Sequence, residues 1–174
     1  MIVSGYLRRL IFTCYLLSPR LVKERIGVFV LQRLGVAAGR GFLDRGCYVF
    51  NLDNLKLGDN SCLGPRCSIY NFAPVSIGRN CQFAAEVTIL TGSHDEKNME
   101  PSKSQISIGE GVWVGARVTV MPGVKIGDHA VIGAGSLVTK DIPDWAVAAG
   151  VPAKVLRKRL SSSSRVGFFG SYDV

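Results

Sequence analysis

The chain has 174 residues, of which 47% are hydrophobic and 20% charged, a balance typical of one folded domain and not of a disordered segment. Its formal net charge of +8 is compatible with nucleic acid, an anionic membrane surface or a polyanionic small ligand, and selects none of them. The five cysteines are odd in number and contain no CxxC pair, which argues against a zinc site or a disulfide framework and favours a reducing, cytoplasmic compartment.

Residues 1–36 are expected to form two amphipathic helices, because apolar side chains recur at i, i+3 and i+4 spacing and the pattern breaks at Ser18 and Pro19. The strongly apolar run from Leu10 to Leu17 has eight residues, whereas a membrane-spanning helix needs about 20, so no transmembrane segment is predicted. The basic residues of this lead-in leave two interpretations open. It is either a cap on the end of a repeat domain or a peripheral segment on the inner face of an anionic membrane.

From about residue 37 to residue 160 an aliphatic residue tends to recur every six positions. A period of six is neither the 3.6 of a helix nor the 2 of a plain strand, so it indicates a repeat architecture. Three six-residue units make one coil, and the coils are expected to stack as a triangular prism of short parallel strands. The repeat is most regular where six consecutive units open with Ile108, Val114, Val120, Ile126, Ile132 and Val138.

Each predicted coil starts with an aliphatic residue and a glycine, and its fourth residue is Asn, Gly or His, types that tolerate the left-handed backbone angles of a sharp corner. Successive coil starts are 20, 31 and 18 residues apart, so the longest interval carries about eleven extra residues. This excess predicts a polar loop at 95–105 that leaves the prism immediately after His94, and projecting loops are common functional sites. The coil starts are Leu57, Ile77, Ile108 and Ile126, and their fourth residues are Asn60, Asn80, Gly111 and His129.

Three cysteines, Cys47, Cys67 and Cys81, fall at the fifth position of their units, where a thiol is expected to act as a small buried hydrophobe. The coils are expected to end with a proline-containing, basic stretch that reaches residue 160. Residues 161–174 are predicted to be a mobile tail.

Several segments occur in the order typical of one family: 91–95 (TGSHD), 112–116 (VWVGA), 132–136 (IGAGS), 138–143 (VTKDIP) and 149–155 (AGVPAKV). Together with the hexads they resemble the hexapeptide-repeat acyltransferases over roughly residues 40–158, and most closely the sugar O-acetyltransferases of galactoside, maltose and colanic-acid or other exopolysaccharide type. The resemblance implies an all-β fold, a left-handed parallel β-helix with a helical lead-in and a short C-terminal extension, assembled as a homotrimer with active sites between subunits. The left hand is an implication of the resemblance alone, because parallel crossovers are right-handed in nearly all folds.

The resemblance further implies acetyl-CoA-dependent transfer of an acetyl group directly to a sugar hydroxyl, in exopolysaccharide or glycan biosynthesis. His94 matches the general base of the family, a role that suits histidine because its neutral imidazole is available near pH 7. His129, the only other histidine, takes a corner position and is expected to be structural. No metal is expected, because the zinc site of the related γ-class carbonic anhydrases needs three histidines.

The matched cofactor positions form a groove with a cationic end. The backbone N–H of Ala116 is the predicted donor to the thioester carbonyl, and Ala134 lies one coil further along the pantetheine path. Gly115 either lines this groove or only allows the coils to stack, and the outward indole of Trp113 is expected to be covered by a subunit or by the cofactor. The CoA phosphates are assigned to Thr139, Lys140, Lys154 and Arg157.

The acceptor sugar is assigned to Asn71 and Phe72, although the surrounding segment departs from the galactoside pattern and leaves the acceptor unidentified. The expected partners are a sugar or glycan and two further copies of the chain, with no nucleic acid. Two alternatives remain open. A xenobiotic (antibiotic) O-acetyltransferase shares the fold and the histidine but usually has a longer acceptor loop than 95–105. A catalytically silent β-helix scaffold would require neither the TGSHD segment nor the cationic positions.

Overall fold

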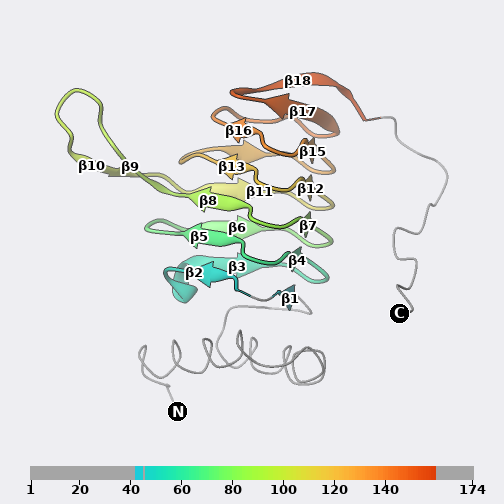
Figure 1. Ribbon diagram of the computed structural model, residues 1–174, viewed down its shortest axis with the longest axis horizontal. Coiled ribbons are helices and arrows are strands. Elements are labelled where there is room, and N and C mark those ends of the chain that lie inside the picture. Colours follow the sequence, from blue (N-terminus) through green and yellow to red (C-terminus); the bar gives the residue numbers. More distant parts are fainter. Residues whose placement is uncertain (1–41, 45, 160–174) are drawn as a thin grey trace, which may run out of the picture.

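The computed structural model describes residues 42–44 and 46–159, and the predicted helices of 1–36 and the tail of 161–174 lie outside the described residues. The described chain is a parallel β-helix whose coils each contribute short strands to three sheets (Figure 1). In this part of the chain, no helix has the length and apolar character needed to cross a membrane. The predicted all-β prism of stacked parallel strands is therefore confirmed.

The three sheets follow one another around every coil. The first contains β3 (Leu55–Leu57), β6 (Val75–Ile77), β11 (Ile106–Ile108) and β14 (Lys125–Ile126). The second contains β1 (Phe42–Leu43), β4 (Cys62–Leu63), β7 (Gln82–Phe83), β12 (Trp113–Val114), β15 (Val131–Ile132), β17 (Ala146–Gly150) and β18 (Ala153–Lys158). The third contains β2 (Tyr48–Val49), β5 (Ser68–Tyr70), β8 (Thr88–Leu90), β13 (Thr119–Val120) and β16 (Leu137–Val138).

Corners join the sheets, and we number them by what they connect. The first corner joins the first sheet to the second, and the second corner joins the second sheet to the third. The third corner returns the chain from the third sheet to the next coil, and between β2 and β3 it holds a short 3-10 helix, η1 (Leu52–Asn54). Left-handed backbone at the first corner is confirmed at Asn60, Asn80, Gly111 and His129, whose φ angles are 58°, 57°, 62° and 57°.

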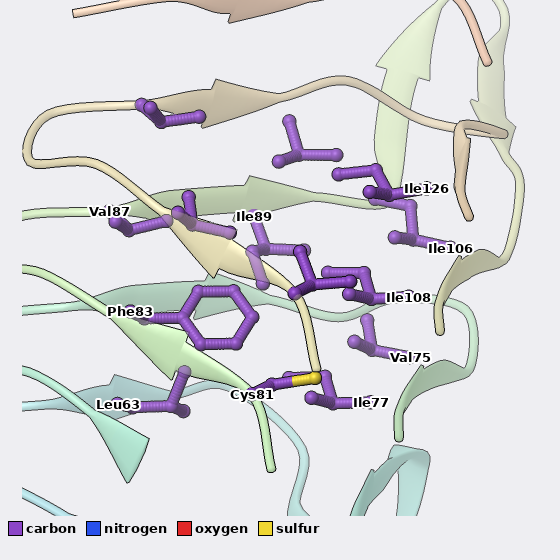
Figure 2. Packing of buried hydrophobic residues seen from close by; sticks show 14 of the residues in the cluster. Leu63, Val75, Ile77, Cys81, Phe83, Val87, Ile89, Ile106, Ile108 and Ile126 are labelled. Atoms are coloured by element: carbon purple, nitrogen blue, oxygen red, sulfur yellow. The ribbon is translucent and has the colours of Figure 1, made fainter. Parts of the chain in front are cut away.

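The predicted coil starts lie beside one another in the first sheet. Leu57 pairs with Ile77, Ile77 with Ile108, and Ile108 with Ile126. Figure 2 shows how Ile77, Ile108, Phe83 and Ile89, drawn from all three sheets, point toward a shared interior, and each is at most 4% exposed. Burial of one such side chain contributes about 1.5–3 kcal/mol, so the stacked aliphatic rows are the main source of stability.

The cysteines at the fifth positions are also in this interior, as predicted. Cys47, Cys67 and Cys81 are buried, and the described cysteines are free thiols. Each thiol approaches a backbone carbonyl of a neighbouring coil; for example, Cys67 Sγ lies 3.2 Å from the oxygen of Ala84. They therefore fill space as small hydrophobes.

The segment predicted as a loop at 95–105 contains a β-strand, and the chain leaves the prism earlier than expected. Strands β9 (Gly92–His94) and β10 (Pro101–Lys103) form an antiparallel hairpin that projects from the level of β8 (Figure 1). His94 is therefore on a hairpin strand and not at the edge of the prism. The sequence hid this hairpin because its residues are polar and mostly exposed, with no alternation of apolar and polar side chains to reveal a strand.

Candidate active site

A groove of about 550 Å³ lies where the hairpin leaves the prism. One part of its lining comes from the ends of the lower coils and the rest from both strands of the hairpin. The imidazole of His94 is exposed in this groove, as a base that must meet a substrate requires. The lining residues are Phe50, Asn51, Phe72, Gly92, Ser93, His94, Pro101, Ser102 and Lys103.

An aromatic wall forms one side of the groove. The rings of Phe50 and Phe72 lie 4.6 Å apart between centroids and are 38% and 48% exposed, respectively. The rings of Tyr48 and Tyr70 lie 5.4 Å apart and are also partly exposed. Exposed rings of this kind can stack against the apolar face of a sugar.

The hairpin presents three side chains on one face. His94 lies directly opposite Pro101, and Gly92 lies opposite Lys103. Side chains two residues apart on a strand share a face, and opposite residues of an antiparallel pair share it too. His94, Pro101 and Lys103 are therefore on the same face, and His94 is the diagonal neighbour of Lys103, a relationship that usually separates Cα atoms by about 7–8 Å.

Of the two predicted acceptor residues, Phe72 lines the groove and Asn71 does not. Asn71 is fully buried, its Oδ1 accepts the N–H of Asn51 at 2.8 Å, and its Nδ2 donates to the carbonyl of Asn51. The side chain of Asn71 is thus used to join two coils. Asn51, which lines the groove, was missed; the signal available was its spacing of 20 residues from Asn71, equal to one coil.

The predicted oxyanion donor lies at the second corner. The N–H of Gly115 donates to Ile132 and that of Arg117 to Ala85, whereas within the described chain no backbone acceptor takes the N–H of Ala116. Pro65 occupies the equivalent position two coils earlier and has no N–H at all, so the fold does not need a donor there. The same holds for Ala134, one coil beyond Ala116, and both N–H groups are therefore available to a ligand.

Gly115 itself has a packing role. A Cβ at this position would come within 2.6 Å of the nitrogen of Ala134, closer than real Cβ atoms approach. The glycine therefore allows the next coil to stack. This contact holds Ala134 directly above the corner that contains Ala116.

Two of the remaining predicted cofactor residues, Trp113 and Arg157, lie at the ends of one row of paired residues across the second sheet. Trp113 lies beside Val131, Val131 beside Val147, and Val147 beside Arg157. Lys154 lies opposite Ala149 on the same terminal pair of strands. Trp113 and Arg157 are both exposed and are three strands apart, about 14 Å at the usual strand spacing.

Thr139 and Lys140 lie elsewhere, at the third corner after β16. This is the corner from which the hairpin with His94 departs two coils earlier. The third sheet separates it from the second corner with Ala116 and Ala134. Within one chain the structure therefore does not bring His94 together with the predicted pantetheine path.

None of the four described cysteines lines this groove, so no described thiol supplies it with a nucleophile. Burial raises the pKa of Cys62 to about 11 and also raises the pKa of Cys81, so both thiols stay protonated near neutral pH. Neither lines the groove. Among residues 42–44 and 46–159, no group of three or more His, Cys, Asp or Glu side chains is arranged to hold a metal ion.

Two family patterns match the prism. The pattern described as bacterial transferase hexapeptide (six repeats) matches residues 105–140, and the hexapeptide repeat of succinyl-transferase matches residues 54–90. The galactoside O-acetyltransferase of Escherichia coli strain K12 is 40% identical over 126 residues, which are 70% of this chain and 62% of that protein. A putative colanic acid biosynthesis acetyltransferase of the same strain is 33% identical over 153 residues, covering 86% of this chain and 84% of that one.

A solved structure of galactoside acetyltransferase in complex with coenzyme A superimposes with a TM-score of 0.78 at 32% identity, covering 88% of this chain and 80% of that chain. The chain belongs to the hexapeptide-repeat acetyltransferase family. It spans about three fifths of the length of the galactoside O-acetyltransferases that it matches, 62% and 60% of two of them.

Proposed function

We propose that the protein transfers the acetyl group of acetyl-CoA to a hydroxyl of a sugar or glycan acceptor. The observation that carries this proposal is the groove at the base of the hairpin, in which His94 faces a sugar-sized space beside the ring of Phe72. The similarity to a galactoside O-acetyltransferase supports a sugar acceptor. The similarity to a putative colanic acid biosynthesis acetyltransferase supports a place in exopolysaccharide or glycan biosynthesis.

In the proposed reaction an imidazole nitrogen of His94 removes the proton of the acceptor hydroxyl as that oxygen attacks the thioester carbonyl. The carbon–sulfur bond then breaks, and the proton passes from the imidazolium to the departing sulfur, which leaves as the thiol of CoA. General-base assistance of this kind contributes about 10²–10⁴-fold to a rate. The absence of any described cysteine from the lining of the groove supports direct transfer over an acetyl-cysteine intermediate.

The second corner is the proposed path of the CoA arm. The free N–H of Ala116 is suited to stabilise the negative charge that develops on the thioester oxygen, and the N–H of Ala134 to hold the pantetheine. Lys154 and Arg157 follow on the terminal strand β18, where exposed cations would meet the phosphates. This arrangement fits the elongated shape of CoA and its acidic end.

The site is proposed to form between copies of the chain. His94 and Ala116 are associated with different corners of the prism, and the third sheet lies between these corners. Packing the second corner of one copy against the third corner of its neighbour would bring base and donor together. We therefore propose a homotrimer, the assembly that the resemblance to the hexapeptide-repeat acyltransferases implies, which is a closed cyclic arrangement.

The proposal is tested by incubating the full chain with acetyl-CoA and a panel of free, nucleotide-linked and oligomeric sugars, with antibiotics that carry hydroxyl groups as a second arm. Thiol release reports turnover, and mass spectrometry identifies the acetylated product. Acetylated sugar is the expected result. If only antibiotics are acetylated, the acceptor is a xenobiotic and not a sugar. If calorimetry shows no CoA binding while the assembly is intact, the assignment as an enzyme is contradicted altogether.

A further inference from the structure

We infer that the acceptor carries an anionic group, a carboxylate or a phosphate, which Lys103 binds beside the hydroxyl that is acetylated. This inference rests on the proposed function and concerns the same groove. Lys103 is its only residue with a permanently charged side chain, and no carboxylate is among the lining residues. A groove for a neutral sugar would gain little from a lone ammonium group.

The position of Lys103 relative to His94 follows from the register of the hairpin. Lys103 is opposite Gly92, and His94 is two residues beyond Gly92 on the same face. The two residues are thus diagonal neighbours, with Cα atoms about 7–8 Å apart, so one sugar ring can contact both side chains. A hydroxyl on one side of a pyranose can face the imidazole while a substituent on the other side meets the ammonium.

Gly92 leaves room for an aromatic ring on this face of the hairpin. Because Gly92 has no side chain, the ring of Phe72 lies against it, with Cδ2 at 2.7 Å from where a Cβ would be. The aromatic ring therefore reaches the strand that carries the imidazole and faces the lysine across the hairpin. An acceptor stacked on Phe72 is held between the base and the cation.

The ammonium group of Lys103 has no carboxylate partner within the described chain. The ion pairs found there join Arg66 and Arg117 to Glu86, Arg79 to Glu110 and, at 4.0 Å, His129 to Glu110. Among the acidic residues of the hairpin turn, Asp95 uses its Oδ1 to accept the N–H groups of Lys97 and Asn98, at 2.9 and 3.3 Å. Lys103 is free to pair with a charged ligand, and charge-assisted hydrogen bonds of this kind are the strong ones.

The test compares acceptors that differ only in charge. Methyl glycosides of the gluco, galacto and manno series are assayed beside the corresponding glycuronides and the glycosides that carry a phosphate on the primary carbon. We measure kcat/KM for each with saturating acetyl-CoA, using the full chain and the variants Lys103→Met, Lys103→Arg and Lys97→Met. Lys97 is an exposed residue of the same hairpin outside the groove, so its loss controls for net charge.

In at least one sugar series the wild type is expected to have a higher kcat/KM for an anionic acceptor than for the neutral glycoside. Comparison of the glycuronides with the phosphorylated glycosides then shows whether the bound group is a carboxylate or a phosphate. Lys103→Met should lower the ratio of anionic to neutral kcat/KM by about 10- to 100-fold, the range for a hydrogen bond to a charged group. Lys103→Arg should restore much of the ratio, and Lys97→Met should leave it unchanged. Raised salt should weaken the preference.

Two results would overturn the inference while the proposed function stands. One is a wild type that acetylates the neutral glycosides better in every series. The other is a Lys103→Met variant that loses the same factor on neutral and anionic acceptors, which would make the lysine a structural part of the hairpin. If no sugar of any charge is acetylated although CoA binds, the proposed function falls and this inference falls with it.

Discussion

The ring of Phe72 occupies the space that a side chain at Gly92 would need, since a Cβ there would lie 2.7 Å from Phe72 Cδ2. The two residues are 20 positions apart in the sequence and meet because one coil stacks on the next. Phe72 follows strand β5 of the prism, whereas Gly92 opens the hairpin that carries His94. This contact therefore couples the aromatic wall of the groove to the proposed base.

Gly92→Ala is expected to lower kcat/KM for the sugar acceptor by about tenfold or more, because the displaced ring no longer supports the acceptor beside His94. The affinity for CoA should change little, since neither Gly92 nor Phe72 is among the residues proposed to bind CoA. The measurement is steady-state kinetics with the acceptor identified in the screen, together with calorimetry for CoA. Backbone strain is not the cause of the effect, because Gly92 does not have a left-handed φ angle.

A double-mutant cycle separates the steric explanation from others. In a Phe72→Leu background the added methyl group of Gly92→Ala meets a smaller side chain, so its cost should shrink to within about twofold. Equal costs of Gly92→Ala in both backgrounds would show that the contact with the ring is irrelevant to activity.

His94→Ala is expected to reduce acetyl transfer by about 10²–10⁴-fold while CoA still binds with nearly normal affinity. The reason is that in the proposed mechanism the imidazole, on hairpin strand β9, acts on the acceptor hydroxyl and is not assigned to hold CoA. Thiol release under single-turnover conditions measures the chemical step. Turnover equal to that of the wild type would eliminate His94 as the base.

The matched control is His129→Asn. His129 has a left-handed φ of 57° at the first corner and stacks on Trp145, with ring centroids 4.3 Å apart. Asn60 and Asn80 occupy the same corner in other coils with the same backbone angle, so asparagine is compatible with it. This variant should fold and should retain acetyl transfer.

Ala116→Pro removes one backbone N–H and is expected to lower kcat by about 10²–10³-fold, the cost of losing one oxyanion donor. The fold should tolerate the proline, because Gly64 and Pro65 already form the equivalent corner two coils earlier. Circular dichroism and the melting temperature verify folding, and steady-state kinetics measure the loss.

Ala85→Pro is the control for Ala116→Pro, since it places a proline at the second corner of the coil between those of Pro65 and Ala116. This variant should keep its activity within about twofold. A loss of similar size in both variants would indicate that proline disturbs the corner in general, and the N–H of Ala116 would then have no special role.

Glu86→Gln is expected to change how stability depends on pH. The carboxylate of Glu86 accepts from Arg117 Nε at 2.7 Å and from Arg66, and these hydrogen bonds lower its pKa below the ordinary value of 4.5. A carboxyl group whose pKa is lower in the folded than in the unfolded state stabilises the fold at pH values above its unfolded-state pKa. This contribution is lost as the pH falls through the folded-state pKa.

The wild type should therefore melt at a higher temperature than Glu86→Gln at pH 7, and the two curves should converge as the pH falls below about 4.5. Differential scanning calorimetry between pH 3 and pH 8 measures this. The difference is expected to be modest, because exposed ion pairs contribute little and are screened by salt. A constant offset between the two curves would show that Glu86 contributes through packing and not through its charge.

The prism could be predicted from the sequence because the six-residue repeat is a local signal. Leu57, Ile77, Ile108 and Ile126 mark the coil starts, and in the structure they pair in register. In a solenoid each coil contacts only its neighbours, so a regular pattern is sufficient to define the architecture. His94 could be selected from the motif that contains it, and its position in a groove agrees with that choice.

The lining of the groove was only partly predictable. Phe72 was selected and lines it, but Asn71 was selected and is buried, its amide used in hydrogen bonds to Asn51. Asn71 and Phe72 are adjacent residues just after β5, and the sequence does not say which of the two faces the ligand. Lys103 was not selected at all, because nothing in a polar loop distinguishes one lysine from another.

The sequence by itself determined the repeat, the number of residues per coil, the buried rows and the one interruption, since each follows from the spacing of apolar side chains. Only the tertiary structure decided that the interruption is a hairpin beginning at Gly92, that His94 shares a face with Lys103, and that Phe72 fills the space above the glycine. The physical reason is that these relationships depend on cross-strand register and on the stacking of coils, which join residues distant in sequence and leave no periodic trace.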